Sequence, residues 1–248
     1  VDVSKRPFLV RTEGGEQLRT QSMIVATGAE ARWLGVPGED RFRGKGGVST
    51  CATCDGFMYR DKPVVVVGGG DTAMEDALVL ARTSSKVTLI HRRDTFRASR
   101  ALAIRVMDHD KITVKWNMTL VSFEGSDQQT STQAYAGASG DDSVSLPQLS
   151  HVIAASTVSG ARERIDCAGA FVAIGHDPNT KLFESQVLMG PNGYLVTLNH
   201  TTATSVQGVF AAGDAADHLY RQAITSAGSG AMASLDAERW LSAQGFAS

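Results

Sequence analysis

The chain has 248 residues, a length that fits one large domain or two small ones at roughly 100–200 residues per domain. Its 42% hydrophobic and 20% charged residues predict a packed core and exclude a wholly disordered protein. The net charge of −2 gives no general attraction to nucleic acid or to an anionic membrane, and no apolar run approaches the roughly 18 residues of a spanning helix.

The first fifty residues predict short strands followed by a loop. Residues 8–25 alternate like two strands around a polar, glycine-containing turn, and the apolar segment that follows runs into Thr27 and Gly28. Residues 33–49 are rich in glycine and charge and predict a linker. Because the sequence begins with Val1 rather than Met, we expect the chain to be a piece of a longer protein.

A Cys-x-x-Cys sequence at Cys51 and Cys54 is the first feature with chemical content. The chain has only three cysteines, too few for a disulfide scaffold, so this pair is either redox-active or half of a zinc site. Zinc needs two further ligands, yet Cys167 stands alone and no histidines are paired at a suitable spacing. A redox dithiol is favoured, with a zinc site and a purely structural pair as the alternatives.

The central segment predicts a βαβ unit that binds a dinucleotide. Its parts are a β-branched strand at 63–67, a helix at 74–83 and a second strand at 86–90. Between the first two lies a Gly-x-Gly-x-x-Ala fingerprint, whose glycines allow a tight turn and close approach to a pyrophosphate, while the alanine allows the helix to pack on the strand. The candidate pyrophosphate-binding residues are Gly68, Gly70, Asp71, Thr72 and Ala73.

Basic residues follow the second strand of this unit and indicate which nucleotide binds. An NAD site places an acidic residue there for the ribose 2′-hydroxyl, but this chain has His91, Arg92 and Arg93, with Arg97 close behind. Guanidinium groups bind a 2′-phosphate through planar, charge-assisted hydrogen bonds. The sequence therefore favours NADPH over NADH, the alternative being a solvated basic turn.

The residues from 112 onward alternate strands and polar segments. Strands are expected at 112–123, 150–156 and 170–174, and the polar stretch 125–147 predicts a flexible surface insertion. A later strand ends at Gly213 and Asp214, a plausible flavin clasp because the carboxylate can accept hydrogen bonds from sugar hydroxyls. Since flavin is the usual mediator between a hydride carrier and a disulfide, an NADPH site beside a dithiol suggests a flavoprotein.

In their order and spacing, five stretches resemble those of the low-molecular-weight, bacterial-type, NADPH-dependent thioredoxin reductases. They are 51–57 (CATCDGF), 68–75 (GGGDTAME), 91–98 (HRRDTFRA), 171–176 (FVAIGH) and 213–224 (GDAADHLYRQAI). The resemblance implies an α/β flavoprotein of two Rossmann-like dinucleotide-binding domains, of the pyridine nucleotide-disulfide oxidoreductase type. An NADPH domain at 35–165, carrying the dithiol, would be inserted into an FAD domain at 1–34 and 166–248.

The resemblance also implies roles for individual residues. Electrons would pass from NADPH to FAD, then to the cysteine pair and to thioredoxin or a thioredoxin-like protein. Cys54 would lie against the flavin, Cys51 would attack the thioredoxin disulfide, and Asp55 would manage the proton, with turn formation as its alternative role. The implied FAD-contacting residues are Thr27, Gly28, Gly213, Asp214, Arg221, Gln222 and Ala223.

One departure from the family concerns its first glycine-rich motif, which binds the FAD pyrophosphate. That motif is absent from the 50 residues before Cys51, so we expect part of the FAD domain to be missing and FAD binding and turnover by this chain to be weak. Another flavin-dependent dithiol reductase, such as a peroxiredoxin reductase, and a non-catalytic NADPH-binding remnant are the alternatives. The family further implies a cytoplasmic protein that is a homodimer in its full-length form.

Overall fold

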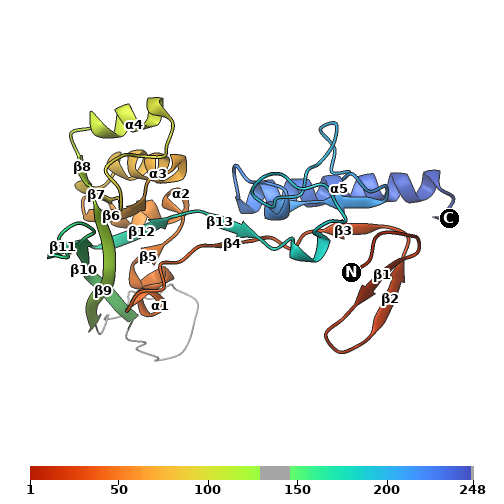
Figure 1. Ribbon diagram of the computed structural model, residues 1–248, viewed down its shortest axis with the longest axis horizontal. Coiled ribbons are helices and arrows are strands. Elements are labelled where there is room, and N and C mark those ends of the chain that lie inside the picture. Colours follow the sequence, from red (N-terminus) through yellow and green to blue (C-terminus); the bar gives the residue numbers. More distant parts are fainter. Residues whose placement is uncertain (129–145, 247–248) are drawn as a thin grey trace, which may run out of the picture. The chain divides into compact units, whose positions relative to one another are not determined.

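The computed structural model describes residues 1–128 and 146–246, which form two compact units (Figure 1). Unit 1 consists of Val1–Glu30 and His176–Ser248, and unit 2 consists of Ala31–Gly175. Most of the expected insertion at 125–147 lies outside the described residues. Its two ends, however, belong to strands rather than to a loop, because β9 extends to Gln128 and β10 begins at Leu146.

A five-stranded parallel sheet is the centre of unit 2 (Figure 1). In spatial order its strands are β5 (Val48–Ser49), β12 (Gly169–Ala173), β6 (Pro63–Gly68), β7 (Lys86–Ile90) and β8 (Ile112–Lys115). The β-branched run of β6 is buried on both faces, as expected for a central parallel strand. Val64 and Val66 belong to one core cluster and Val65 to another, because successive side chains point to opposite faces.

The helices of unit 2 include one that packs closely on the sheet. They are α1 (Glu39–Phe42), α2 (Ala52–Asp55), α3 (Asp71–Ala81) and α4 (Arg100–Met107). Helix α3 buries Met74, Ala77 and Leu80 in the same cluster as Val64 and Val66. It begins at Asp71 rather than near residue 74 as expected, so the second half of the glycine fingerprint is already helical.

An antiparallel sheet covers the other side of the unit 2 core. It comprises β9 (Met118–Gln128), β10 (Leu146–Ser156) and β11 (Arg162–Asp166), with β10 in the middle. Leu120, Phe123 and Val152 pack in the cluster that contains Val65 of β6. The expected linker at 33–49 is more ordered than predicted, because it contains α1 and the short 3-10 helix Gly44–Gly46.

Unit 1 is built on two-stranded sheets and one long helix (Figure 1). Its pairs are β1 (Phe8–Arg11) with β2 (Gln17–Thr20), β3 (Met23–Val25) with β14 (Val209–Ala211), and β4 (Ala29–Ala31) with β13 (His176–Pro178). The helix α5 (Ala223–Ala243) buries Ala233 and Ala237 against Phe210 of β14. No helix within the described residues is both long and apolar enough to cross a membrane.

The boundaries between the units differ from those expected at 34/35 and 165/166. Residues 31–34 and 166–175 belong to unit 2. The reason for the second shift is that β12 is an interior strand of the five-stranded sheet, hydrogen-bonded to both β5 and β6. The expected boundary came from the family resemblance, which implied that residues 166–248 belong to the FAD domain.

Candidate functional site

Cys51 and Cys54 form a disulfide across the start of α2. Cys51 precedes the helix as its N-cap, and its sulfur accepts a hydrogen bond from the Cys54 backbone N–H at 3.1 Å. Cys51 is half-buried, whereas Cys54 is exposed. After reduction of the disulfide, the thiolate of Cys51 would be the form that acts as a nucleophile.

Asp55 is held beside the disulfide by a serine that the sequence reading missed. The Ser49 hydroxyl donates to Asp55 Oδ2 at 2.6 Å and accepts from the Cys51 backbone N–H at 3.0 Å. Ser49 is buried at the end of β5, so one hydroxyl connects the carboxylate to the cysteine backbone. Nearby, burial and the Asp55 charge raise the pKa of Tyr59.

The glycine loop, residues 68–70, joins β6 to α3, and Gly68 has no space for a larger side chain. A Cβ atom on Gly68 would lie 2.4 Å from the Ala173 carbonyl oxygen and 2.7 Å from Ala73 Cβ. Ala73 itself is fully buried against the sheet. This agrees with the roles expected for the fingerprint residues: the glycine allows the tight turn, and the small alanine lets the helix approach the strand.

The arginine loop, residues 91–99, is tied directly to the glycine loop. The carbonyl of Gly69 accepts hydrogen bonds from Arg97 N at 2.8 Å and Ala98 N at 3.1 Å. The Asp71 carboxylate accepts from Ser99 N at 2.7 Å. Asp71, expected to contact the cofactor, therefore fixes the far end of the arginine loop, and the two loops form one connected surface.

Three exposed guanidinium groups, those of Arg92, Arg93 and Arg97, lie on the arginine loop. A Cβ on Gly70 would lie 3.6 Å from Arg97 Nη2, so this group stands beside the glycine loop. His91 differs from them, because its ring is buried and its Nε2 contacts the Thr95 carbonyl oxygen at 2.9 Å. The arrangement fits NADPH: the free backbone N–H groups at the start of α3 suit the pyrophosphate, and the arginines suit the 2′-phosphate.

The flavin candidates of unit 1 gather at the carboxyl ends of two parallel strands. β3 pairs with β14 through Ile24 and Phe210, so the segments that follow both strands emerge at one edge. Thr27 and Gly28 follow β3, and their carbonyls accept hydrogen bonds from Asn179 at 3.2 and 2.9 Å. This edge is where open α/β sheets bind ligands, and its glycine and acidic residues suit a phosphorylated, hydroxyl-rich group such as FAD.

Gly213 and Asp214 follow β14 and are fixed by serines of α5. Gly213 adopts a left-handed conformation, and its N–H donates to Ser229 Oγ at 2.9 Å. Asp214 accepts from the Ser226 hydroxyl at 3.0 Å, which orients its carboxylate. The serines were not singled out from the sequence, although they lie three residues apart, on one face of α5.

Arg221, Gln222 and Ala223 lie at the entry to α5. The helix begins at Ala223, with Gln222 as its N-cap in a capping box. Arg221 has positive φ, and its N–H donates to Asp217 Oδ2 at 3.0 Å. Asp217 thus shapes the segment that carries the flavin candidates, a role that the sequence reading missed.

The Asp217 carboxylate titrates below its usual range. Burial raises its pKa, but hydrogen bonds lower it by more, so the net shift is downward. The donors are the backbone N–H groups of Tyr220, Leu219 and Arg221 and the Thr225 hydroxyl. Asp217 accepts hydrogen bonds from the N–H groups two and three residues ahead, as aspartates in turns commonly do. The tendency of Asp to form such turns was therefore the only signal in the sequence.

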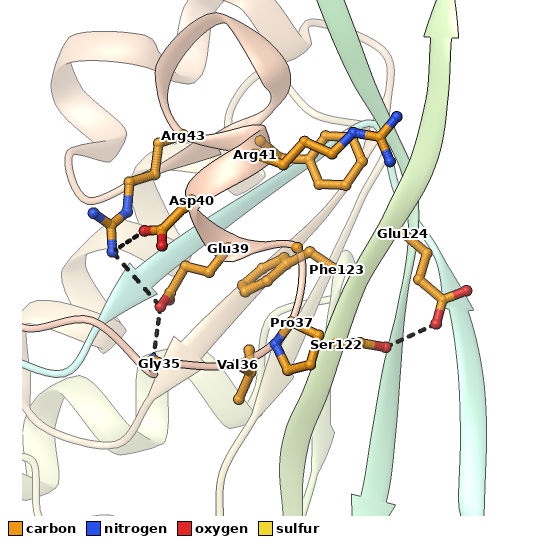
Figure 2. A pocket seen from close by; sticks show the side chains of 12 residues that line it. Gly35, Val36, Pro37, Glu39, Asp40, Arg41, Arg43, Ser122, Phe123 and Glu124 are labelled. Carbon is orange, nitrogen blue, oxygen red and sulfur yellow. Dashed lines mark hydrogen bonds and ion pairs between the residues drawn. The ribbon is translucent and has the colours of Figure 1, made fainter.

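A cavity of about 710 Å³ lies elsewhere in unit 2, between residues 35–43 and 122–124 (Figure 2). None of the expected site residues lines it, and its charged groups are already paired. Arg43 Nη2 lies 2.8 Å from Asp40, and the buried Glu39 carboxylate accepts from Leu34 N and Gly35 N at 2.9 and 2.7 Å. These contacts anchor the start of unit 2 to its core.

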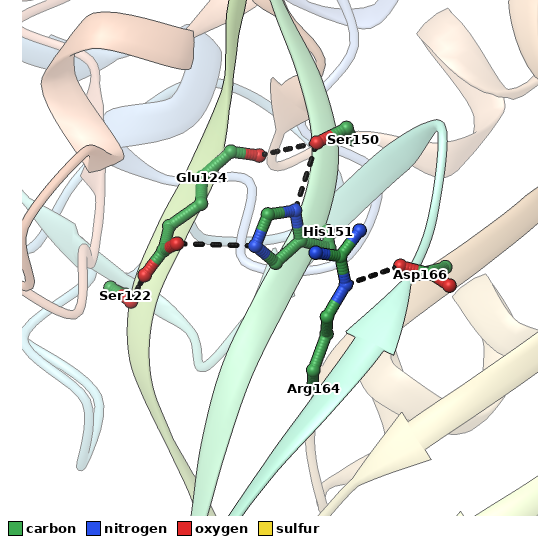
Figure 3. A network of polar contacts seen from close by, with 6 residues as sticks. All are labelled: Ser122, Glu124, Ser150, His151, Arg164 and Asp166. Atoms are coloured by element: carbon green, nitrogen blue, oxygen red, sulfur yellow. Dashed lines mark hydrogen bonds and ion pairs between the residues drawn. The ribbon is translucent and has the colours of Figure 1, made fainter.

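A second polar group lies on the antiparallel sheet (Figure 3). His151 lies 3.1 Å from Glu124 Oε2 and 2.9 Å from the Ser150 hydroxyl. Ser150 is the extra residue of a bulge in the β9–β10 pairing, which breaks the alternation of the strand at this point. Hydrogen bonds from the Ser122 hydroxyl and from His151 lower the pKa of Glu124. The group contains none of the expected site residues.

Comparison with known proteins adds an independent line of evidence. The sequence profile of the pyridine nucleotide-disulphide oxidoreductases matches residues 1–230. A thioredoxin reductase of Rickettsia conorii is 45% identical over 97% of this chain and 72% of its own length, and one of Mycolicibacterium smegmatis is 48% identical over 93% and 68%. The solved thioredoxin reductase of Giardia duodenalis superposes with a TM-score of 0.85 at 38% identity, covering 97% of this chain and 72% of that one.

Proposed function

The chain belongs to the pyridine nucleotide-disulphide oxidoreductase family and, within it, to the thioredoxin reductases. From this membership we propose a role for each of its functional residues. The reaction passes two electrons from NADPH through FAD and the Cys51–Cys54 pair to a thioredoxin disulfide. The observation that carries the proposal is the closed disulfide on the same unit as the connected glycine and arginine loops. The relatives favour this reaction over that of another dithiol reductase or a non-catalytic remnant.

We assign NADPH to unit 2 and FAD to unit 1. In unit 2 the glycine loop and the start of α3 would hold the pyrophosphate, while Arg92, Arg93 and Arg97 would hold the 2′-phosphate. In unit 1 the residues proposed to hold FAD are Thr27, Gly28, Gly213, Asp214, Arg221, Gln222 and Ala223. When bound, FAD supplies the conversion of a hydride into a pair of electrons that a disulfide can accept.

The reduced cysteine pair would act by thiol–disulfide exchange. The Cys51 thiolate attacks one sulfur of the thioredoxin disulfide, which forms a mixed disulfide and releases the other thioredoxin sulfur as a thiolate that takes up a proton. The Cys54 thiolate then attacks Cys51 Sγ. This second step restores the Cys51–Cys54 disulfide seen in the structure and releases thioredoxin with both thiols reduced.

Asp55 is the group we propose for proton transfer beside the pair. Its carboxylate is oriented by the Ser49 hydroxyl, which also accepts from the Cys51 backbone N–H. A carboxylate in this position can take a proton from a thiol as the dithiol is oxidised and, once protonated, can supply a proton to a thiolate as the disulfide is reduced. The short Ser49 hydrogen bond supports a positioned role rather than turn formation alone.

Two exposed apolar side chains offer a docking surface for the partner. Phe57 and Met58 follow the dithiol directly and are 70% and 41% exposed. Aromatic and methionine side chains are enriched in protein interfaces, and this pair is the nearest large apolar surface to Cys51 along the chain. We infer that thioredoxin, or a thioredoxin-like protein, contacts these residues while its disulfide reaches Cys51.

We further propose a homodimer and a cytosolic location. The exposed apolar residues Ile224, Met232 and Leu235 of α5 support self-association, because side chains of this kind gain stability when they are covered. A reduced cysteine supports a reducing compartment: Cys167 is free and buried, and burial raises the pKa of its thiol to about 12.

Single-turnover exchange tests the dithiol assignment without requiring bound flavin. The chain is reduced with dithiothreitol, desalted and mixed with oxidised thioredoxin, and free thiols are counted in each protein. We expect one thioredoxin disulfide to be reduced per chain. Cys54→Ser should accumulate a mixed disulfide with thioredoxin, because the resolving thiol is absent, and Cys51→Ser should not. Cys167→Ser is the control and should behave like the native chain, since Cys167 is buried.

Two outcomes would contradict the proposal. A mixed disulfide that forms with Cys51→Ser and not with Cys54→Ser would reverse the order of the two cysteines. Failure of the reduced native chain to transfer electrons to thioredoxin, while it still reduces a small disulfide, would remove thioredoxin as the partner.

A further inference from the structure

Three aromatic rings form a cluster at the carboxyl edge of the unit 2 sheet. The ring centroids of Phe96 and Trp116 lie 4.3 Å apart, those of His91 and Phe96 5.5 Å, and those of His91 and Trp116 6.0 Å. His91 is buried, and the other two rings are half-buried. Trp116 comes directly after β8, so the cluster joins the end of that strand to the arginine loop.

The backbone around Trp116 is hydrogen-bonded to the same loop. The Lys115 carbonyl accepts from His91 N at 2.9 Å, Asn117 N donates to the Arg93 carbonyl at 3.1 Å, and Met118 N donates to the His91 carbonyl at 3.0 Å. Trp116 therefore sits in a turn whose neighbours on both sides hold residues 91–93. Its ring adds the side-chain contact with Phe96 from the other half of the loop.

His91 extends the cluster to the glycine loop. A Cβ atom on Gly69 would lie 2.1 Å from His91 Cε1, so the backbone of Gly69 passes directly over the imidazole ring. The Gly69 carbonyl in turn accepts from Arg97 N and Ala98 N. A continuous set of contacts thus runs from Trp116 through Phe96 and His91 to the backbone that would face a pyrophosphate.

We propose that Trp116 is a positioning residue that sets the preference of this protein for NADPH over NADH. The inference rests on the proposed use of the arginine loop for the 2′-phosphate. Trp116 does not need to touch the nucleotide; it acts through Phe96 and His91 by holding the loop that carries Arg92, Arg93 and Arg97.

Preorganisation is the physical reason for this effect. The three arginines are exposed and have long side chains, so ordering them around a phosphate costs conformational entropy. A loop already fixed at its backbone leaves only the side chains to be ordered on binding. Loosening the loop would weaken the contacts to the 2′-phosphate, which NADH lacks, more than the contacts to the pyrophosphate, which both nucleotides share.

The test measures NADPH and NADH binding to the 248-residue chain by titration calorimetry. We expect Trp116→Ala to weaken NADPH binding by about fivefold and NADH binding by less than about twofold, the size expected for loss of one aromatic pair. Trp116→Phe, which keeps an aromatic ring against Phe96, should restore most of the preference. Trp33→Ala is the matched control, because Trp33 lies in the same unit and contacts Arg43 instead.

A second measurement reports on the loop without any nucleotide. Trypsin cleaves after arginine, so the rate of cleavage after Arg92 and Arg93, followed by mass spectrometry, measures how often the loop opens. We expect faster cleavage there in Trp116→Ala than in the native chain or in Trp116→Phe. Retained NADH binding in each variant shows that the unit is folded.

The inference is overturned if Trp116→Ala keeps the native ratio of NADPH to NADH affinity. An equal fall of both affinities is one case of this outcome. The inference is also overturned if Trp116→Phe loses as much preference for NADPH as Trp116→Ala. A native chain that binds the two nucleotides equally would instead contradict the proposed use of the arginine loop. The two failures are therefore distinguished by the native chain alone.

Discussion

At the scale of single residues, some arginines of unit 2 are ion-paired and others are not. Arg41, Arg43 and Arg164 each form an ion pair with a carboxylate, at 2.8 Å in every case. Arg92 and Arg93 form no such pair with any described residue. Since an unpaired guanidinium at the ligand-binding edge of a parallel sheet is available to an external anion, the difference in pairing supports the assignment of the 2′-phosphate.

Replacing both Arg92 and Arg93 by alanine should separate the two nucleotides. Each charge-assisted contact contributes about 1.5–3 kcal/mol, so NADPH affinity should fall by at least about a hundredfold while NADH affinity changes little. Calorimetry on the double variant measures both constants. Arg41→Ala is the control, because Arg41 is paired with Asp127 away from this edge. Equal losses for NADPH and NADH would refute the 2′-phosphate assignment.

How far single residues were predictable depended on whether their partners are local in sequence. The dithiol and the glycine fingerprint are short-range patterns, and the structure places both as expected. The role of Asp71 was not readable, because its partner Ser99 is 28 residues away. Ser49 was missed for a related reason: a buried strand serine has many possible partners, and only the fold brings it to Asp55.

At the scale of elements, the type of each helix or strand was more predictable than the residues at which it begins and ends. The β-branched run of β6 and the helical pattern of α3 identified a parallel strand and its crossover helix. The membership of β12 in unit 2 could not be read locally, because it is set by long-range pairing with β5 and β6. The expected linker at 33–49 proved to hold the buried Glu39, which a charge-rich composition had concealed.

The entry to α5 should be sensitive to acid through Asp217. Its pKa is lowered in the folded protein, so the carboxylate stabilises the fold above about pH 4 and this contribution is lost as pH falls through the lowered pKa. Because the group is only half-buried and is still screened by solvent, Asp217→Asn should lower the free energy of unfolding at pH 7 by only about 1 kcal/mol.

Urea unfolding at a series of pH values measures this effect. The difference between the native chain and Asp217→Asn should shrink as pH falls below about 4, the usual pKa of an aspartate, because the carboxyl of the native chain becomes protonated as pH passes through its lowered pKa. Asp94→Asn is the control for the removal of an exposed carboxylate. A difference that stays constant across this range would show that the charge of Asp217 contributes nothing.

At the scale of the whole molecule, the two units have unequal means of stabilisation. Unit 2 has a five-stranded sheet with a core cluster on each face. The described part of unit 1 has two-stranded sheets, and it leaves large apolar side chains exposed, among them Ile24 at 41%, Leu235 at 54% and Ile224 at 80%. Two-stranded sheets are marginal without further packing, so unit 1 should be the less stable of the two.

Heating should therefore unfold the 248-residue chain in two steps, which differential scanning calorimetry resolves. The lower transition belongs to unit 1 and the upper to unit 2. NADPH should raise only the upper transition, because a ligand stabilises the unit that binds it, by about 2.7 kcal/mol at one hundred times its dissociation constant. NADH at the same concentration is the control and should raise that transition less, because NADH lacks the 2′-phosphate that the arginine loop would bind. A single cooperative transition, or a rise in the lower transition with NADPH, would contradict the division of binding between the units.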